Sequence, residues 1–200
     1  MEIKKGQQRI VLVLPRLNIV IKFPIIYLNA AVANSFYLFR DVIRIRDKEA
    51  IKERLKIEFL ATLDSSMITS ILGSLLGGII VNWKEFKFYW KTKNSLLQPT
   101  YFSFLGIFNI QRYGKLCQSR PVDLWCQLRK LTNNEVFKDS HHFDNPNNFC
   151  VDNGRLKMLD YGNNKCQLVI MLYGEKISEF FNPMHRCDGS KECSEMPALL

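Results

Sequence analysis

Residues 145–163 read NPNNFCVDNGRLKMLDYGN, the most specific pattern in the chain. Two short apolar runs flank Asn153-Gly154, a pair that accepts the positive φ angles of a two-residue hairpin turn. If this pair forms the centre of the turn, Asn148 lies opposite the residue before Asp160. The sequence therefore predicts a β-hairpin that carries two polar side chains at its open end.

Asn148 and Asp160 form a candidate Mg²⁺ site. An amide oxygen and a carboxylate are hard-oxygen ligands, and Mg²⁺ takes few protein ligands and completes its shell with water and phosphate. Asp144 lies four residues before Asn148 and is suited to accept a proton from an attacking hydroxyl group. Asn and Asp are also common beside turns, so a hairpin without a metal is the alternative.

Three groups of residues in this region, His142-Phe143-Asp144, Asn148 and Asp160-Tyr161-Gly162, resemble the catalytic loop and metal-binding motif of the protein kinase-like superfamily, which includes aminoglycoside and other small-molecule phosphotransferases. The resemblance implies that Asp144 is the catalytic aspartate and that His142 belongs to the catalytic loop. It also implies that Asn148 and Asp160 bind the metal, and that ATP and Mg²⁺ are the cofactors.

The N-terminal half is compatible with this resemblance. Residues 9–14 and 17–23 are β-branched runs that predict a strand hairpin. Lys22 near the end of the second run either reaches water at a strand edge or faces a cleft. By resemblance, Lys22 is the lysine that holds the nucleotide phosphates, and Glu85 is the helix glutamate that pairs with it.

The remaining elements complete the predicted fold. Residues 41–63 show a helical repeat of apolar positions beside a basic row, residues 99–113 predict two strands around Gly106, and residues 121–131 predict a helix. The predicted fold class is α+β, a bilobal kinase-like fold with an antiparallel-sheet N-lobe, a helical insertion and a reduced C-lobe. The predicted parts are an N-lobe at 1–114 with the insertion at about 25–80, a C-lobe at 115–184 and an irregular tail at 185–200.

Several departures from the kinase-like pattern keep a second hypothesis open. Only Asn145-Pro146-Asn147 separate Asp144 from Asn148, one residue fewer than usual, so Asn147 is an alternative metal ligand and Asp139 an alternative to Asp144. No glycine-rich phosphate loop precedes the predicted strands, and the chain after Gly162 is short. The alternative is a catalytically weak or inactive module that binds a nucleotide or a partner.

Charge and hydropathy bear on the partners. The formal net charge is +9, which suits a polyanion such as a nucleotide, whereas no base-reading motif supports nucleic acid. Residues 65–83 are uncharged and long enough for a membrane span, but their serines and glycines fit a closely packed buried helix equally well. A membrane-associated basic protein is therefore a further alternative. The sequence does not identify the acceptor substrate.

The N-terminus and the cysteines indicate a compartment. Residues 1–10 contain no apolar stretch of the kind found in a signal peptide, and the six cysteines form no CxxC pair or regular framework. We therefore expect thiols and a cytoplasmic protein.

Overall fold

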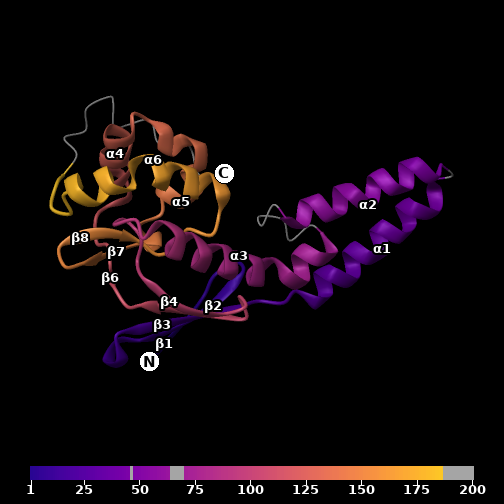
Figure 1. Cartoon of the computed structure of the whole chain (residues 1–200), viewed down its shortest axis with the longest axis horizontal. Helices are drawn as coiled ribbons and strands as arrows, with labels where there is room; N and C mark the ends of the chain where they lie inside the picture. Colours follow the sequence, from indigo (N-terminus) through magenta and orange to yellow (C-terminus); the bar gives the residue numbers. More distant parts are fainter. Residues whose placement is uncertain (46, 64–69, 187–200) are drawn as a thin grey trace. The chain divides into compact units, whose positions relative to one another are not determined.

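The computed structural model describes residues 1–45, 47–63 and 70–186 (Figure 1). Their helices and strands give an α+β protein, as the sequence predicts. The chain divides into two compact units, the first comprising residues 1–86 with 101–111 and the second residues 87–100 with 112 onward. The elements are β1 (Glu2–Lys5), β2 (Arg9–Leu14), η1 (Pro15–Leu17), β3 (Ile19–Pro24), α1 (Leu28–Arg44), α2 (Lys48–Leu63), α3 (Ile71–Thr92), β4 (Thr100–Phe104), β5 (Phe108–Arg112), β6 (Lys115–Leu116), α4 (Pro121–Thr132), η2 (Glu135–Asp139), α5 (Ser140–Phe143), η3 (Pro146–Asn148), β7 (Phe149–Asp152), β8 (Arg155–Met158) and α6 (Asn164–Phe180).

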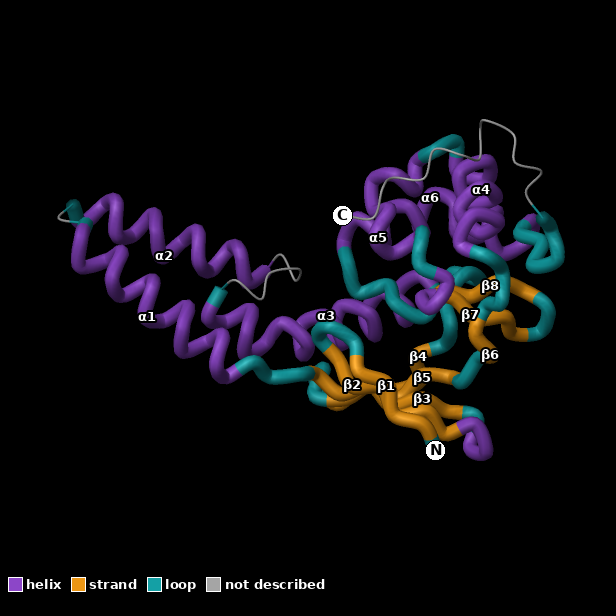
Figure 2. Tube along the Cα trace, turned by 180° about the vertical axis from the view of Figure 1, so that it is seen from behind, coloured by secondary structure: helices purple, strands orange, loops and turns teal. Residues whose placement is uncertain are grey.

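The first unit is built on a five-stranded sheet of order β1-β2-β3-β5-β4 (Figure 2). The hairpin predicted from residues 9–14 and 17–23 is confirmed, since β2 pairs antiparallel with β3 and places Val11 opposite Lys22. Side chains alternate across a strand, and Val13, Val20 and Lys22 lie on the face that α3 covers. The predicted strands around Gly106 are also confirmed, as β4 and β5.

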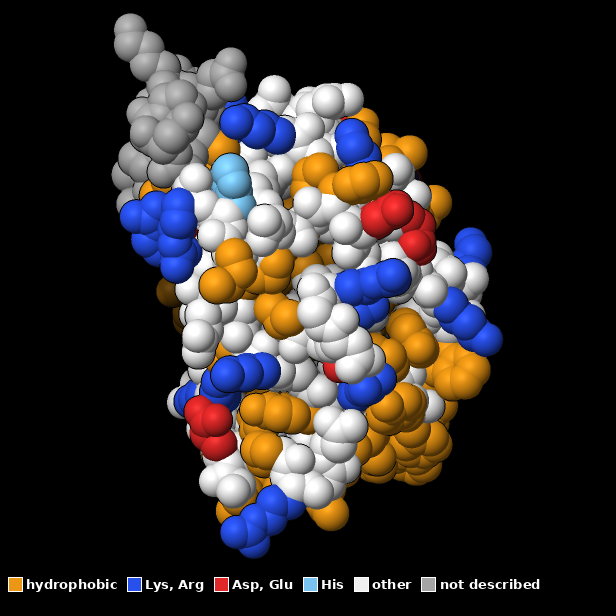
Figure 3. Space-filling model, turned by 90° about the vertical axis from the view of Figure 1, so that its left-hand side faces the viewer, with side chains coloured by type: hydrophobic (Ala, Val, Ile, Leu, Met, Phe, Trp, Pro, Cys, Tyr) orange, Lys and Arg blue, Asp and Glu red, His pale blue; other side chains and the backbone are white. Residues whose placement is uncertain are grey.

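The other face of this sheet is aromatic. The ring of Phe108 lies at the centre of a cluster, with ring centroids 6.2 Å from Phe23 and 5.9 Å from both Phe102 and Phe104. Phe102 and Phe104 are about half exposed. Hydrophobic side chains also gather at the lower right of the surface drawn in Figure 3. The strands of this sheet thus place both valines and charged side chains toward α3, and aromatic side chains on the opposite face.

Helix α3 packs closely on the sheet because of its glycines. A Cβ on Gly78 would lie 2.6 Å from the carbonyl oxygen of Gln8 and 2.7 Å from Cβ of Pro24. In the described part of residues 65–83, the reading as a buried, glycine-packed helix holds for the side of α3 that meets the sheet, whereas Leu72, Leu76 and Trp83 on the other side are between 37% and 41% exposed. Residues 65–69 lie outside the described residues. Among the helices that the structure describes, none is long and apolar enough to cross a membrane.

Substitution of Gly78 by alanine is expected to lower the free energy of unfolding by about 1–3 kcal/mol, because the added methyl group meets the carbonyl oxygen of Gln8 and the ring of Pro24. Gly77 is the matched control, since a Cβ there lies 3.7 Å from its nearest neighbour, the amide nitrogen of the Gln8 side chain. Gly77→Ala is expected to stabilise the helix by up to about 1 kcal/mol. Urea denaturation of both variants measures the difference, and equal effects would contradict the close packing.

The helix predicted at 41–63 is wrong in its start. The chain forms α1 from Leu28 to Arg44, leaves helical geometry at Ile45 (φ −85°, ψ 118°) and begins α2 at Lys48. The apolar repeat at residues 51, 55, 59 and 63 lies wholly within α2 and therefore does not mark where the preceding helix ends. The basic row of α2 is a solvated face, as Lys52 pairs with Glu49 at 2.7 Å and both side chains are more than 70% exposed.

The second unit holds the larger apolar core. A three-stranded sheet of order β6-β7-β8 packs with α4 and α6 around side chains that are wholly buried, among them Trp125, Phe143, Phe149, Tyr161 and Ile170. The helix predicted at 121–131 is confirmed as α4, which has proline at its first position. The second unit consists of two segments, residues 87–100 and residues 112 onward. The predicted N-lobe boundary at 114 lies near the start of the second segment, whereas the first segment falls within the predicted N-lobe.

The cysteines differ in part from the expected thiols. Cys117, Cys150 and Cys166 are buried and free, whereas Cys126 is disulfide-bonded. Cysteine usage therefore no longer supports a reducing compartment. The cytoplasmic localisation stays a prediction.

Candidate functional site

The hairpin forms in the predicted register. β7 and β8 pair antiparallel with Phe149 opposite Met158, and Asn153 (φ 51°) and Gly154 (φ 74°) form the turn. The amide of Leu159 donates to the carbonyl oxygen of Asn148 at 2.7 Å, which extends the pairing by one residue. Asn148 and Asp160 therefore lie at the open end of the hairpin, and both are half-buried.

The short loop before Asn148 orients that side chain. Asn145 caps η3, because its side-chain oxygen accepts from the amide of Asn147 at 3.0 Å. Asn148 Nδ2 donates to the carbonyl oxygen of His142 at 3.0 Å. This bond engages the nitrogen end of the amide, so Oδ1 is the end suited to a cation. Asn147 is exposed, and no described bond orients its side chain.

His142 is held by a buried carboxylate. Its Nδ1 lies 2.9 Å from Oδ1 of Asp139, a residue that is 8% exposed. The second oxygen of Asp139 is buried, with no hydrogen-bond partner in the described part of the chain. Carboxylates that hold an imidazole in this way orient the ring and select its tautomer. The sequence offered Asp139 only as an alternative to Asp144; the structure gives it a different position, against His142.

Asp144 is the C-cap residue that follows α5, and it is half-buried. Burial raises the pKa of its carboxyl group above the ordinary value, and the charge of Asp139 adds to the rise, while His141 and His142 oppose it. A carboxylate with a raised pKa is a better proton acceptor than an ordinary one. This property suits the role that the resemblance implies for Asp144.

The raised pKa also predicts a stability effect. Because the folded protein holds the proton of Asp144 more tightly than the unfolded chain, stability is lost as the pH rises from the ordinary value of 3.8 through the raised one. Asp144→Asn is therefore expected to raise the melting temperature at neutral pH and to have little effect below pH 3.8. Thermal melts across this range measure the effect, and equal shifts at both ends would contradict it.

A second cluster lies in the first unit, on the sheet face that α3 covers. Glu85 of α3 is wholly buried and accepts from Lys22 Nζ at 2.5 Å and from the guanidinium of Arg9. Gln111 Nε2 lies 3.3 Å from the same carboxylate. Asn82, one turn before Glu85, donates to the carbonyl oxygen of Lys22 at 3.2 Å. The predicted pairing of Lys22 with Glu85 is thus confirmed, and Lys22 does not reach water at a strand edge, since it is 4% exposed.

Sequence reasoning missed Arg9. It opens β2, an even number of residues before the buried Val13, so it lies on the same face as that residue. The alternation of residues along the strand could have shown that Arg9 is buried, because it shares a face with Val13. With Lys22 it gives this cluster two cationic side chains against Glu85.

The predicted site residues fall into two groups. Lys22 and Glu85 lie together in the first unit, and the other predicted residues, Asp144, His142, Asn148 and Asp160, belong to the second. Within the described ranges, no set of three or more His, Cys, Asp and Glu side chains is arranged to hold a metal ion. The donors at the hairpin end fit Mg²⁺, which is bound by one or two carboxylates and keeps several waters, better than Zn²⁺.

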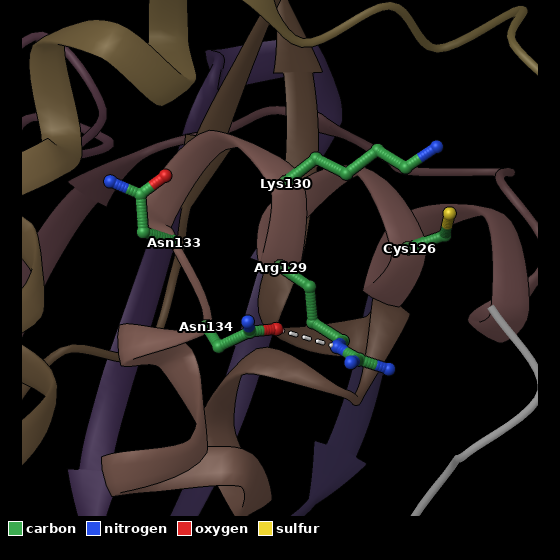
Figure 4. A pocket seen from close by; sticks show the side chains of 5 residues that line it. All are labelled: Cys126, Arg129, Lys130, Asn133 and Asn134. Carbon is green, nitrogen blue, oxygen red and sulfur yellow. Dashed lines mark hydrogen bonds between the residues drawn. The ribbon is translucent and has the colours of Figure 1, made fainter. Parts of the chain in front are cut away.

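A pocket of about 320 Å³ lies elsewhere in the second unit (Figure 4). It is lined by residues at the end of α4 and just after it, among which Arg129 donates to Asn134 at 2.9 Å and stands over the ring of Phe137. No predicted site residue lines it. The pocket lies at the C-terminal end of α4, where the helix dipole disfavours anions. The presence of Arg129 and Lys130 therefore does not make this pocket a phosphate site.

No protein-family model matches the chain, and no curated protein or solved structure matches it.

Proposed function

We propose that the chain is an ATP- and Mg²⁺-dependent phosphotransferase with a bilobal, kinase-like fold. The observation that carries the proposal is the buried ion pair between Lys22 on β3 and Glu85 on α3, two residues 63 positions apart. The resemblance in the C-terminal half implied this pair, although the N-terminal half has no distinctive motif. The order of elements agrees, since three strands of the five-stranded sheet precede α3 and the other two follow it.

Five of the six predicted site residues take a direct role in this proposal. Lys22 holds the nucleotide phosphates, and Glu85 keeps its ammonium group in place. Asn148 and Asp160 bind Mg²⁺, which supplies charge neutralisation to the transferring phosphoryl group. Asp144 orients the acceptor hydroxyl and takes its proton. Most of the rate enhancement of such a site comes from positioning and electrostatic stabilisation, which preformed, hydrogen-bonded side chains provide.

The second candidate function is a catalytically weak or inactive nucleotide-binding module. The β1–β2 turn favours it, because Gly6 is the one glycine there and its amide donates to the carbonyl oxygen of Arg9 within the turn. Because the Gly6 amide is already hydrogen-bonded within the turn, fewer backbone amides can bind phosphate here than in a glycine-rich loop. In this alternative the same residues bind the nucleotide, and phosphate transfer is slow or absent.

Thermal shift with ATP and ADP, each with and without Mg²⁺, tests both forms of the proposal. We expect ATP with Mg²⁺ to raise the melting temperature of the wild type, and Lys22→Met to abolish the shift. Stabilisation at a hundredfold excess of ligand over Kd corresponds to about 2.7 kcal/mol. ATP turnover by the wild type and by Asp144→Asn then separates an enzyme from an inactive binder. Absence of any nucleotide-dependent shift would reject both.

A further inference from the structure

Helix α1 carries an apolar stripe on its exposed side. Every member of the stripe is between 63% and 71% exposed, and the members are Leu28, Val32, Phe36, Phe39 and Ile43. Spacings of four, four, three and four residues place them on one face of a helix, within a sector of about 80°. The stripe is about 22 Å long at the rise of an α-helix. Monomeric proteins rarely expose so continuous an apolar surface without a use for it.

The stripe is not the face by which α1 packs in the first unit. α1 and α2 lie side by side (Figures 1 and 2), and Asp41 of α1 pairs with Arg54 of α2 at 3.6 Å. On the same side, Asn34 Nδ2 donates to Ser74 Oγ of α3 at 3.2 Å, and Ala31 is buried. The packed face and the apolar stripe are therefore different faces of one helix.

The charges of α1 are divided between these faces. On a helical projection, Arg40 lies about 40° beyond Phe36 at one edge of the stripe, and Arg44 lies about 40° further round on the same side. Arg40 also stands 5.2 Å from the ring of Tyr37. The acid of α1, Asp41, lies on the packed face and pairs with α2. The edge of the stripe is thus cationic, with no acid of α1 beside it.

We propose that α1 binds to the surface of an anionic lipid bilayer, lying in the plane of the interface with its apolar stripe among the acyl chains. A helix with an apolar face that contains phenylalanine and with arginines at its edge binds in this way, buried about 5–10 Å deep. The arginines meet lipid phosphates, and the chain's net charge of +9 adds attraction to the anionic surface.

Charge favours lipid over a second copy of the chain. In a dimer formed through the stripes, Arg40 and Arg44 of one copy would lie beside α1 of the other copy. The sides of α1 next to the stripe carry only arginines and neutral residues, so these arginines would meet no carboxylate there. An anionic bilayer offers those arginines a phosphate at every position along the helix. The inference is independent of the proposed phosphotransferase function, because it uses none of the residues assigned to the nucleotide or the metal.

Sedimentation of the full chain with vesicles tests the proposal. We expect binding to vesicles of phosphatidylcholine mixed with phosphatidylglycerol, weaker binding to phosphatidylcholine alone, and loss of binding as salt is raised. Replacement of Phe36 and Phe39 together by serine is expected to weaken binding to the mixed vesicles by roughly tenfold or more. Arg40→Gln and Arg44→Gln are each expected to weaken it by about fivefold.

The matched control replaces Met171 and Leu172 of α6 by serine, since both are about as exposed as the stripe residues, at 62% and 61%. This variant is expected to bind vesicles like the wild type, and unchanged melting temperatures check that both double variants fold. Equal vesicle binding by the phenylalanine variant and the wild type would overturn the proposal. Loss of a dimer in the phenylalanine variant, seen by light scattering without lipid, would also overturn it in favour of a second copy.

Discussion

Replacement of Glu85 by alanine is expected to lower the free energy of unfolding by about 3–5 kcal/mol. Glu85 is wholly buried and is shared by Arg9 and Lys22, which are 7% and 4% exposed. Its removal leaves both cations buried without that carboxylate. Urea denaturation followed by circular dichroism measures the loss.

Two controls make this prediction specific. Glu49 pairs with Lys52 on the solvated face of α2, and Glu49→Ala is expected to change stability by less than about 1 kcal/mol. Lys22→Met removes one cation but keeps the pair of Arg9 with Glu85, so it is expected to cost less than Glu85→Ala while still abolishing nucleotide binding. A Glu85→Ala variant as stable as the wild type would show that the cluster does not hold α3 to the sheet.

Replacement of Asp160 by asparagine is expected to reduce ATP turnover by about 100-fold or more and to abolish the part of nucleotide stabilisation that needs Mg²⁺. The variant keeps the size of the side chain and the hairpin, and removes one ligand charge. Turnover assays with titrated Mg²⁺ and thermal shift with ATP measure the two effects.

Asp152 provides the matched control for Asp160. It lies at the other end of the same hairpin, where it pairs with Arg112 at 3.3 Å. Asp152→Asn is expected to leave Mg²⁺-dependent stabilisation unchanged. If Asp160→Asn and Asp152→Asn behave alike, Asp160 is not a metal ligand. Comparison of Asn148→Ala with Asn147→Ala distinguishes the two candidate amides in the same assay, and we expect only Asn148→Ala to weaken Mg²⁺ dependence.

The local elements of the fold were predictable from the sequence. The hairpin of residues 149–158 forms in the expected register because Asn153-Gly154 specifies its turn by local backbone conformation. The helix at 121–132 and the strands around Gly106 were likewise read from short-range patterns. The start of α1 was missed, although Val32, Phe36, Phe39 and Ile43 recur at the spacing of one helical face.

The candidate site was predictable only in part. Lys22 and Glu85 were paired through the resemblance, and the structure confirms the ion pair while their role in nucleotide binding stays a prediction. Arg9 was not recognised as a partner of Glu85, because the two residues lie 76 positions apart and nothing near Arg9 in the sequence shows which side chain it meets. Asp139 lies only three residues before His142 and was recognised only as an alternative to Asp144. Burial of a charged residue and the identity of its partner depend on packing between distant segments.

The sequence by itself determined what neighbouring residues decide among themselves: the turn at Asn153-Gly154, the alternation of the strands, and the placement of Asn148 and Asp160 at one end of a hairpin. The tertiary structure decided which charges are buried together, the close approach of Gly78 to the sheet, and the exposure of the stripe on α1. Backbone conformation is a short-range property, whereas burial and ion pairing arise only when segments far apart in the chain pack against each other.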